Sequence, residues 1–265
     1  MKRVFGFIYG IVCYGVFLFV FLRAVWFVWT MDSVAAQAPL SSALLINAAL
    51  LGAFAVQHSG MARQSFKRAW TKIVPPLLER STYVLMASMA LFSVVQFWQP
   101  LPGTIWTVHN WAAVVLLNVL FWFGWALLFT CTLLIDHFDL FGLRQAWEYL
   151  RNGTYEPPRF RTPGPYRVVR HPLYLGFVIA FWSAPHMTSG RLFFAVMCTG
   201  YILVAIQLEE RDLVTFHGEA YRRYRSGVSM LVPLPGKKAA PGQELASATR
   251  TTGKASEAAP RSPVR

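Results

Sequence analysis

Charged residues are scarce in this 265-residue sequence. They make up 14% of the chain, whereas about 25% is usual for a soluble domain. Hydrophobic residues account for 55%, which excludes a largely disordered chain. The three cysteines, Cys13, Cys131 and Cys198, all lie within apolar runs, so a disulfide scaffold is excluded and buried thiols are expected. Low charge and high apolar content together predict an integral membrane protein.

Two kinds of ligand-binding motif are also missing. No G-x-G-x-x-G lies on a strand–turn–helix, which excludes a soluble Rossmann domain. The cluster Asp136-His137-Phe138-Asp139 has metal-binding residue types. No cysteine or second histidine stands near it at a zinc spacing, so we predict no metal site.

Long apolar runs are present instead. A membrane-spanning helix needs about 20 mostly apolar residues, and the sequence has six candidate runs: 4–22, 40–56, 81–98, 111–135, 172–184 and 192–208. The last two are separated by a turn at 186–190 and predict a helical hairpin. The alternative for the first run is a cleaved signal peptide, but the run exceeds the usual apolar core of about 7–15 residues, so we expect a retained helix.

The net charge of +13 is explained by topology. If the N-terminus is cytoplasmic, all 25 Lys and Arg residues except Arg23 and Arg191 fall in cytoplasmic segments, as the positive-inside rule requires. Arg23 lies near a helix end, from which its side chain can reach the interface. The excess of basic over acidic residues therefore predicts contact with anionic lipids and no binding of nucleic acid. We expect a multi-pass protein of the bacterial inner membrane with both termini cytoplasmic.

The chain divides into three parts. Residues 1–135 hold four spanning helices, residues 136–235 hold a cytoplasmic loop, the hairpin and a cytoplasmic segment, and residues 236–265 form a basic tail without aromatic residues. Such a tail cannot bury enough surface to fold and is expected to be disordered. The predicted fold class is all-α: a polytopic membrane bundle with a C-terminal hairpin and a cytoplasmic cofactor-binding segment.

Functional residues gather at the cytoplasmic ends of the hairpin. Arg170 and His171 precede Pro172, which suits a first helical turn, and Glu209 and Glu210 end the last span. Tyr221 and Tyr224 follow at i, i+3 on one helix face. The cations alone could simply anchor a helix at lipid headgroups. Together with carboxylates and aromatic rings, they suit a zwitterionic, cationic ligand such as S-adenosylmethionine.

The order of these residues resembles a known family. Arg170-His171-Pro172-x-Tyr174-x-Gly176, then Glu209-Glu210 and Tyr221-x-x-Tyr224, is similar to the C-terminal signature of the isoprenylcysteine carboxyl methyltransferase superfamily. The N-terminal half resembles its nurim-like branch, which includes bacterial methanethiol S-methyltransferases. That likeness rests on three segments: Ala55 to Arg63, Val74 to Tyr83, and Phe138 to Gln145.

The resemblance implies a methyltransferase that uses S-adenosylmethionine and no metal. The implied cofactor residues are Arg170, His171, Tyr174, Gly176, Glu209, Glu210, Tyr221 and Tyr224, and Arg144 and Gln145 are candidates to cover the cofactor. The expected acceptor is a small thiol, foremost methanethiol, which yields dimethyl sulfide. The base is His58, His171 or a carboxylate. The alternatives are methylation of a prenylcysteine carboxylate or a lipid amine, and a non-catalytic nurim-like scaffold.

Overall fold

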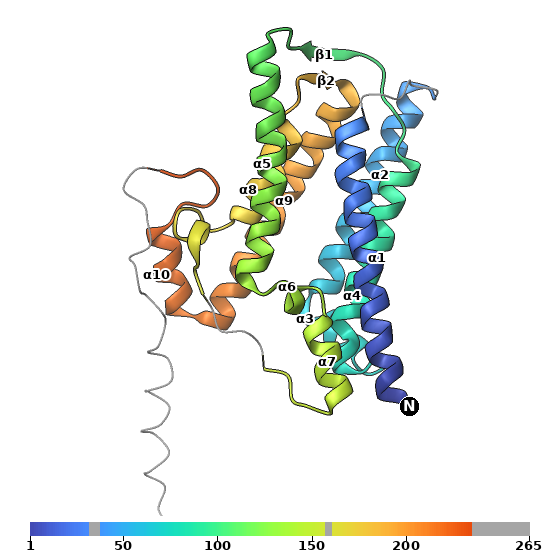
Figure 1. Cartoon of the computed structure of the whole chain (residues 1–265), viewed down its shortest axis with the longest axis vertical. Helices are drawn as coiled ribbons and strands as arrows, with labels where there is room; N and C mark the ends of the chain where they lie inside the picture. The colour runs from blue at the N-terminus through green and yellow to red at the C-terminus, as the bar shows by residue number, and fades with distance from the viewer. Residues whose placement is uncertain (32–37, 157–160, 235–265) are drawn as a thin grey trace, which may run out of the picture.

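The computed structural model describes residues 1–31, 38–156 and 161–234. Its framework is five long helices, which run side by side along the long axis of the molecule (Figure 1): α1 (Lys2–Thr30), α2 (Leu40–Ala62), α4 (Pro76–Phe97), α5 (Trp111–Ile135) and α9 (Ser189–His217). The shorter helices are α3 (Gln64–Trp70), α6 (His137–Leu140), α7 (Leu143–Arg151), the 3-10 helix η2 (Gly164–Arg167), α8 (Pro172–Trp182) and α10 (Glu219–Gly227). The predicted disordered tail, 236–265, lies outside the described residues.

The long helices are built for a bilayer. Each has at least 22 residues, and about 20 suffice to cross the hydrocarbon core. Only 11% of the most apolar stretch of α2 is buried inside the protein, and 22% of that of α1, α5 and α9. Because so much apolar surface faces outward, the protein is a multi-pass membrane protein.

The helices form two groups. In one group, α1 and α2 pack on α4, and α7 packs on α1 and α4; in the other, α8 packs between α5 and α9. An aromatic-rich core joins the groups in the half of the bundle farther from the N-terminus, with Trp98, Trp125, Phe181 and Phe194 all buried. Phe194 contacts Trp98 and Phe181 edge-on, with ring centroids 5.6 and 5.1 Å apart.

A pair of glycines brings α5 and α8 into close contact. A Cβ atom at Gly176 would lie 2.6 Å from the carbonyl oxygen of Gly124, and one at Gly124 would lie 2.6 Å from the carbonyl oxygen of Gly176. Small residues allow such backbone approach in membranes, where close packing rather than the hydrophobic effect drives helix association. Gly176 therefore has a packing role in the fold.

A short sheet caps the end of the bundle opposite the N-terminus (Figure 1). Strands β1 (Thr104–Thr107) and β2 (His186–Thr188) pair antiparallel, and the Trp106 indole donates to the carbonyl of Ala184 at 3.1 Å. The all-α expectation holds for the spanning segments but omitted this sheet. Residues 186–188 form a strand where the sequence indicated only a turn, because residues 104–107, far earlier in the chain, pair with their backbone groups.

Helix α9 continues past the predicted end of the last span. Its 29 residues run on to His217, a length of about 43 Å that exceeds the roughly 30 Å hydrocarbon core. Gly218, with φ +57°, ends the helix, and α10 starts at Glu219. The apolar run correctly located the span, but the polar turns that follow it are helical too. Glu209 and Glu210 therefore lie within a continuous helix.

We expect Gly176→Ala to destabilise the protein. The added methyl group would overpack the contact with α5, which costs about 1–3 kcal/mol. Gly200→Ala in α9 is the matched control, because a Cβ there meets nothing within 4 Å and alanine is the better helix former. Thermal unfolding in detergent should show a lower midpoint for the first variant only. Equal midpoints would contradict the close approach of α5 and α8.

Candidate functional site

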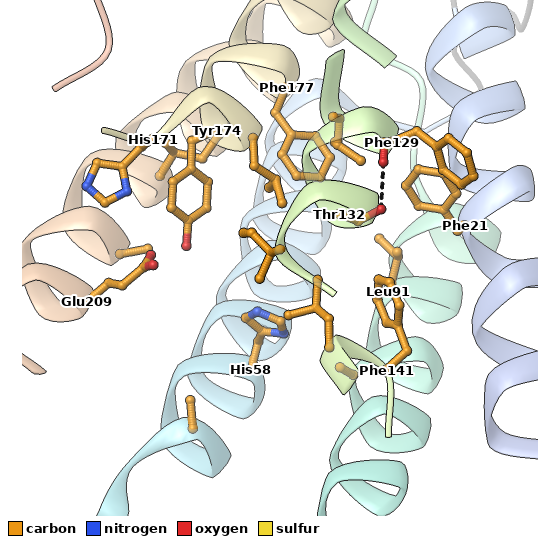
Figure 2. A pocket seen from close by; sticks show the side chains of 18 of the residues that line it. Phe21, His58, Leu91, Phe129, Thr132, Phe141, His171, Tyr174, Phe177 and Glu209 are labelled. Carbon is orange, nitrogen blue, oxygen red and sulfur yellow. Dashed lines mark hydrogen bonds between the residues drawn. The ribbon is translucent and has the colours of Figure 1, made fainter. Parts of the chain in front are cut away.

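A cavity of about 1130 Å³ lies between the two helix groups. Seven of the residues singled out from the sequence line it: His58, Arg170, His171, Tyr174, Glu209, Tyr221 and Tyr224. Figure 2 shows His171, Tyr174 and Glu209 on one side and His58, from α2, pointing into the same space. The other two, Gly176 and Glu210, do not line the cavity. The fold thus brings residues from distant parts of the chain to one site.

Glu210 is the centre of a buried ion network. One carboxylate oxygen accepts from Arg170 Nε at 2.7 Å and lies 3.1 Å from His171 Nε2. The other lies 3.3 Å from Arg225 Nε. Only 4% of the Glu210 side chain is exposed, so these partners stabilise a charge that would otherwise be costly to bury. The network ties α9 to the start of α8 and to α10.

Arg170 makes further contacts that fix this side of the site. Its Nη1 donates to the carbonyls of Arg225, at 2.9 Å, and Val228. The backbone amides of Arg170 and His171 donate to Ser229 and Met230. The chain after α10 therefore folds back over the start of α8. Within the described residues, Nε and Nη1 of Arg170 are thus engaged, and Nη2 is the guanidinium nitrogen that can still bind a ligand.

Glu209 faces the other way from Glu210. It lines the cavity, and Figure 2 shows the Tyr174 hydroxyl directed toward its carboxylate. Successive residues of an α-helix are about 100° apart around the axis, so one of two adjacent glutamates can serve the ion network while the other serves the cavity. The pair of carboxylates expected from the sequence is split between these two tasks.

Tyr221 and Tyr224 form the wall contributed by α10. Their ring centroids are 5.8 Å apart, and the Tyr224 hydroxyl donates to the carbonyl of Tyr166 at 2.6 Å. Burial raises the pKa of both phenols, so both stay neutral across the physiological range. They supply aromatic surface and hydroxyl dipoles rather than charge.

His58 lies in a polar pocket at the opposite wall. The Tyr83 hydroxyl is 3.1 and 3.2 Å from its two ring nitrogens, and Phe54 stacks on the imidazole with centroids 5.2 Å apart. The next residue, Ser59, meets the Tyr201 hydroxyl at 2.9 Å. Within the described residues, no carboxylate bonds to His58, so the imidazole is held by aromatic and phenolic groups.

His137 lies at the α6 end of the cavity and was considered above only as a metal ligand. Its Nδ1 lies 2.9 Å from the Thr132 hydroxyl, which itself donates to the carbonyl of Phe129. Thr132 must therefore accept from Nδ1–H, and Nε2 accepts from the Tyr14 hydroxyl at 2.9 Å. Burial lowers the pKa of His137, in agreement with this neutral form. Both nitrogens are occupied, so this residue shapes the cavity wall.

The other polar residues of this segment do not face the cavity. Asp136 pairs with Arg144 at 3.1 Å, and Gln145 is buried and donates to Asp139. Across the described ranges, no group of three or more His, Cys, Asp or Glu side chains could hold a metal ion. Arg144 and Gln145 stabilise the turn between α6 and α7.

Sequence reasoning missed Arg80 and Tyr83 as site residues. Both line the cavity beside His58, and both lie in the 74–83 segment that carries the family resemblance. Their relation to His58 was not visible because it depends on how α4 packs against α2. The signal that could have found them is an arginine and a tyrosine at i, i+3 near the end of an apolar helix.

Fold and site together define a polytopic helical membrane protein with a deep cavity of mixed polar and aromatic lining. No protein-family model and no solved structure matches the sequence. Methanethiol S-methyltransferase of Mycobacterium tuberculosis is 52% identical over 241 residues, which cover 89% of this chain and 98% of the relative. The enzyme of the same name from Crocosphaera subtropica is 48% identical, with 90% and 95% covered. Human nurim is 32% identical over 66% of this chain and 69% of its own length. The chain belongs to the methanethiol S-methyltransferase family.

We expect Glu210→Gln to lower stability while Glu209→Gln leaves it nearly unchanged. Removing the buried charge leaves Arg170 and His171 without their partner, which costs about 3–5 kcal/mol for a buried pair. Glu209 has no ion pair within the described part of the chain, and the two changes are chemically identical. Thermal unfolding of the two purified variants checks this. A similar loss in both would mean that Glu210 is not the centre of a stabilising network.

Proposed function

We propose that this protein is an S-adenosylmethionine-dependent methyltransferase that converts methanethiol into dimethyl sulfide. The observation that carries the proposal is 52% identity to a methanethiol S-methyltransferase across 98% of that relative. The cavity supports it, because its volume exceeds the roughly 300–1,000 Å³ typical of small-molecule sites and so allows room for a donor and a small acceptor together.

The α8–α10 side of the cavity fits S-adenosylmethionine. Glu209 offers a carboxylate for the ammonium group or the ribose hydroxyls, and Arg170 Nη2 is placed for a carboxylate. The rings of Tyr174, Tyr221 and Tyr224 suit an adenine or a sulfonium. When bound, S-adenosylmethionine supplies an electrophilic methyl group. His171, held on Glu210, orients this wall by fixing the start of α8.

The α2–α4 side suits a small thiol. His58 is the candidate base, because its imidazole lies in the cavity and Tyr83 and Phe54 fix its orientation. A thiolate is the reactive form of a thiol. Phe177 lines the cavity between Tyr174 and Thr132 (Figure 2) and gives this part of it an apolar surface. Holding the acceptor between this ring and His58 lowers the entropic barrier to transfer.

The same architecture supports a definite orientation in the membrane. We place α3, α7, α10 and both termini on the cytoplasmic side of a bacterial inner membrane and the β1–β2 sheet outside. Under this arrangement, α8 and α9 form the hairpin and the site opens toward cytoplasmic S-adenosylmethionine. The short α8 spans only part of the bilayer, because 11 residues extend about 16 Å.

Reporter fusions test this topology. Fusions after residues 35 and 105 should report an external location, and fusions after residues 70 and 150 a cytoplasmic one, because the basic residues concentrate in the latter segments. A cytoplasmic signal at 105 would contradict the proposed orientation.

A headspace assay tests the reaction. Purified protein given S-adenosylmethionine and methanethiol should release dimethyl sulfide, and His58→Ala should reduce the rate about 10²–10⁴-fold if His58 is the base. The deficit should shrink at high pH, where the thiol ionises unaided.

Three outcomes would each select an alternative. Methyl esterification of farnesylcysteine without sulfide formation would favour the prenylcysteine reaction, and methylation of a lipid amine would favour the phospholipid reaction. No methyl transfer to any of these acceptors, in protein shown by calorimetry not to bind S-adenosylmethionine, would favour a non-catalytic scaffold.

A further inference from the structure

The arginines of the cavity differ in how their charge is balanced. Arg63 pairs with Asp212 at 3.3 Å, and Arg170 pairs with Glu210 at 2.7 Å. Arg161 is exposed on the chain before η2. Arg80 is half-buried and, among the residues that the structure describes, has no carboxylate oxygen within 4 Å. It therefore brings to the cavity a positive charge that no ion pair neutralises, and the Asp139 carboxylate interacts with it from outside the cavity.

Arg80 is also held in place. Its Nε donates to the carbonyl of Leu140 at the end of α6, at 2.8 Å, and its guanidinium carbon lies 5.2 Å from the centre of the Tyr83 ring. Tyr83 in turn touches both nitrogens of His58. A guanidinium, a phenol and an imidazole thus follow one another along one wall. In the described part of the chain, Nη1 and Nη2 have no hydrogen-bond partner.

Other charged and titratable groups surround this wall. Glu79 is buried and does not line the cavity, Asp139 is engaged by Gln145, and Lys67 lies on α3 outside the lining. The remaining groups that line the cavity on the neighbouring elements are His58 on α2, Arg63 between α2 and α3, Tyr83 on α4, His137 on α6, Tyr174 on α8, and Tyr201, Glu209 and Asp212 on α9. Of the carboxylates in the lining, Asp212 is paired with Arg63 and Glu209 lies on the α8–α10 side.

We propose that Arg80 is a catalytic residue whose guanidinium binds the ionised sulfur of the small thiol. The inference rests on the proposed function and adds the group that stabilises the nucleophile. In this step the S–H bond breaks, its electron pair stays on sulfur as the thiolate, and the proton moves to a ring nitrogen of His58. Arg80 then faces an anion, for which its fixed, unpaired charge is suited.

The size of the effect follows from electrostatics. An opposite charge within about 4–6 Å lowers the pKa of an acid by about 1–3 units. The cysteine thiol titrates near 8.5, and a simple alkyl thiol, which lacks the electron-withdrawing backbone of cysteine, is a weaker acid still, so it is almost wholly protonated at neutral pH. Without the Arg80 charge, the fraction of bound thiol that is ionised at neutral pH should fall to roughly one tenth to one thousandth of its wild-type value. Because the deficit lies in ionisation, it should disappear as the pH approaches the pKa of the free thiol.

The experiment compares Arg80→Gln with Arg80→Lys. Both lose the Nε–H donated to Leu140, but only the lysine keeps a positive charge. The measurement is the pH dependence of kcat/KM for methanethiol. In Arg80→Gln the midpoint of the rise should move about 1–3 pH units upward, and kcat/KM at neutral pH should fall about 10- to 1,000-fold. Arg80→Lys should keep the wild-type midpoint. Arg68→Gln, an exposed change of the same charge on α3, is the matched control and should behave as wild type.

Two further measurements do not depend on the variants turning over substrate. Thiocyanate should inhibit the wild-type protein competitively with methanethiol, because a site for a thiolate accepts a small soft anion. The ultraviolet thiolate absorption of ethanethiol bound to protein with S-adenosylhomocysteine should appear at lower pH in wild type than in Arg80→Gln.

The outcomes separate this inference from the proposed function. Wild-type protein that forms no dimethyl sulfide overturns the proposed function. Wild-type protein that does form it, with equal pH midpoints in the wild type and Arg80→Gln, overturns only the role of Arg80. Equal shifts in Arg80→Gln and Arg80→Lys would assign the effect to the Leu140 hydrogen bond and also overturn it. If Arg80→Gln does not fold, absence of competition by thiocyanate in wild type refutes the inference.

Discussion

The arrangement of the α8–α10 side depends on one buried carboxylate, Glu210. A charge with 4% exposure is tolerable only when it is paired and hydrogen-bonded, and Arg170, His171 and Arg225 supply these partners from two separate segments. These contacts hold the start of α8 against α9 and bring α10 beneath both. Because Glu210 is fixed in this direction, helix geometry turns Glu209 into the cavity. A structural constraint thereby places the side chain that we propose for binding the cofactor.

The cavity exists because close packing is confined to certain parts of the bundle. The Gly124–Gly176 contact pulls α8 onto α5, and the aromatic core around Trp125 and Phe194 joins the two helix groups at one end. Toward the other end, the groups touch through Ser59 and Tyr201 and through Arg63 and Asp212. The space enclosed between the groups is lined largely by aromatic and aliphatic side chains. A small apolar substrate can therefore be held away from water within the membrane-embedded part of the protein.

Much of this could be predicted from local pattern. The apolar runs located the spanning helices, and the residues around Arg170 and Glu209 were correctly expected to meet, because hairpin geometry brings the two ends of α8 and α9 together. Patterns did not show that the last span continues unbroken to His217 or that Gly218 separates it from α10. Nor could they show that Gly176 serves packing or that Arg80 lies beside His58, because both depend on which helices meet in three dimensions.

The charges of the cavity suit the reaction proposed for it. Glu209 gives the α8–α10 side a carboxylate that attracts a cationic donor, and Arg80 gives the α4 side a guanidinium that attracts an anionic acceptor. Aromatic rings lie between them and carry no net charge. Methyl transfer from a sulfonium to a thiolate removes one positive and one negative charge. An apolar, low-dielectric middle favours that loss of charge, and the neutral sulfide that results retains no electrostatic attraction to Arg80. The same separation of charges that assembles the reactants thus allows the product to leave toward the bilayer.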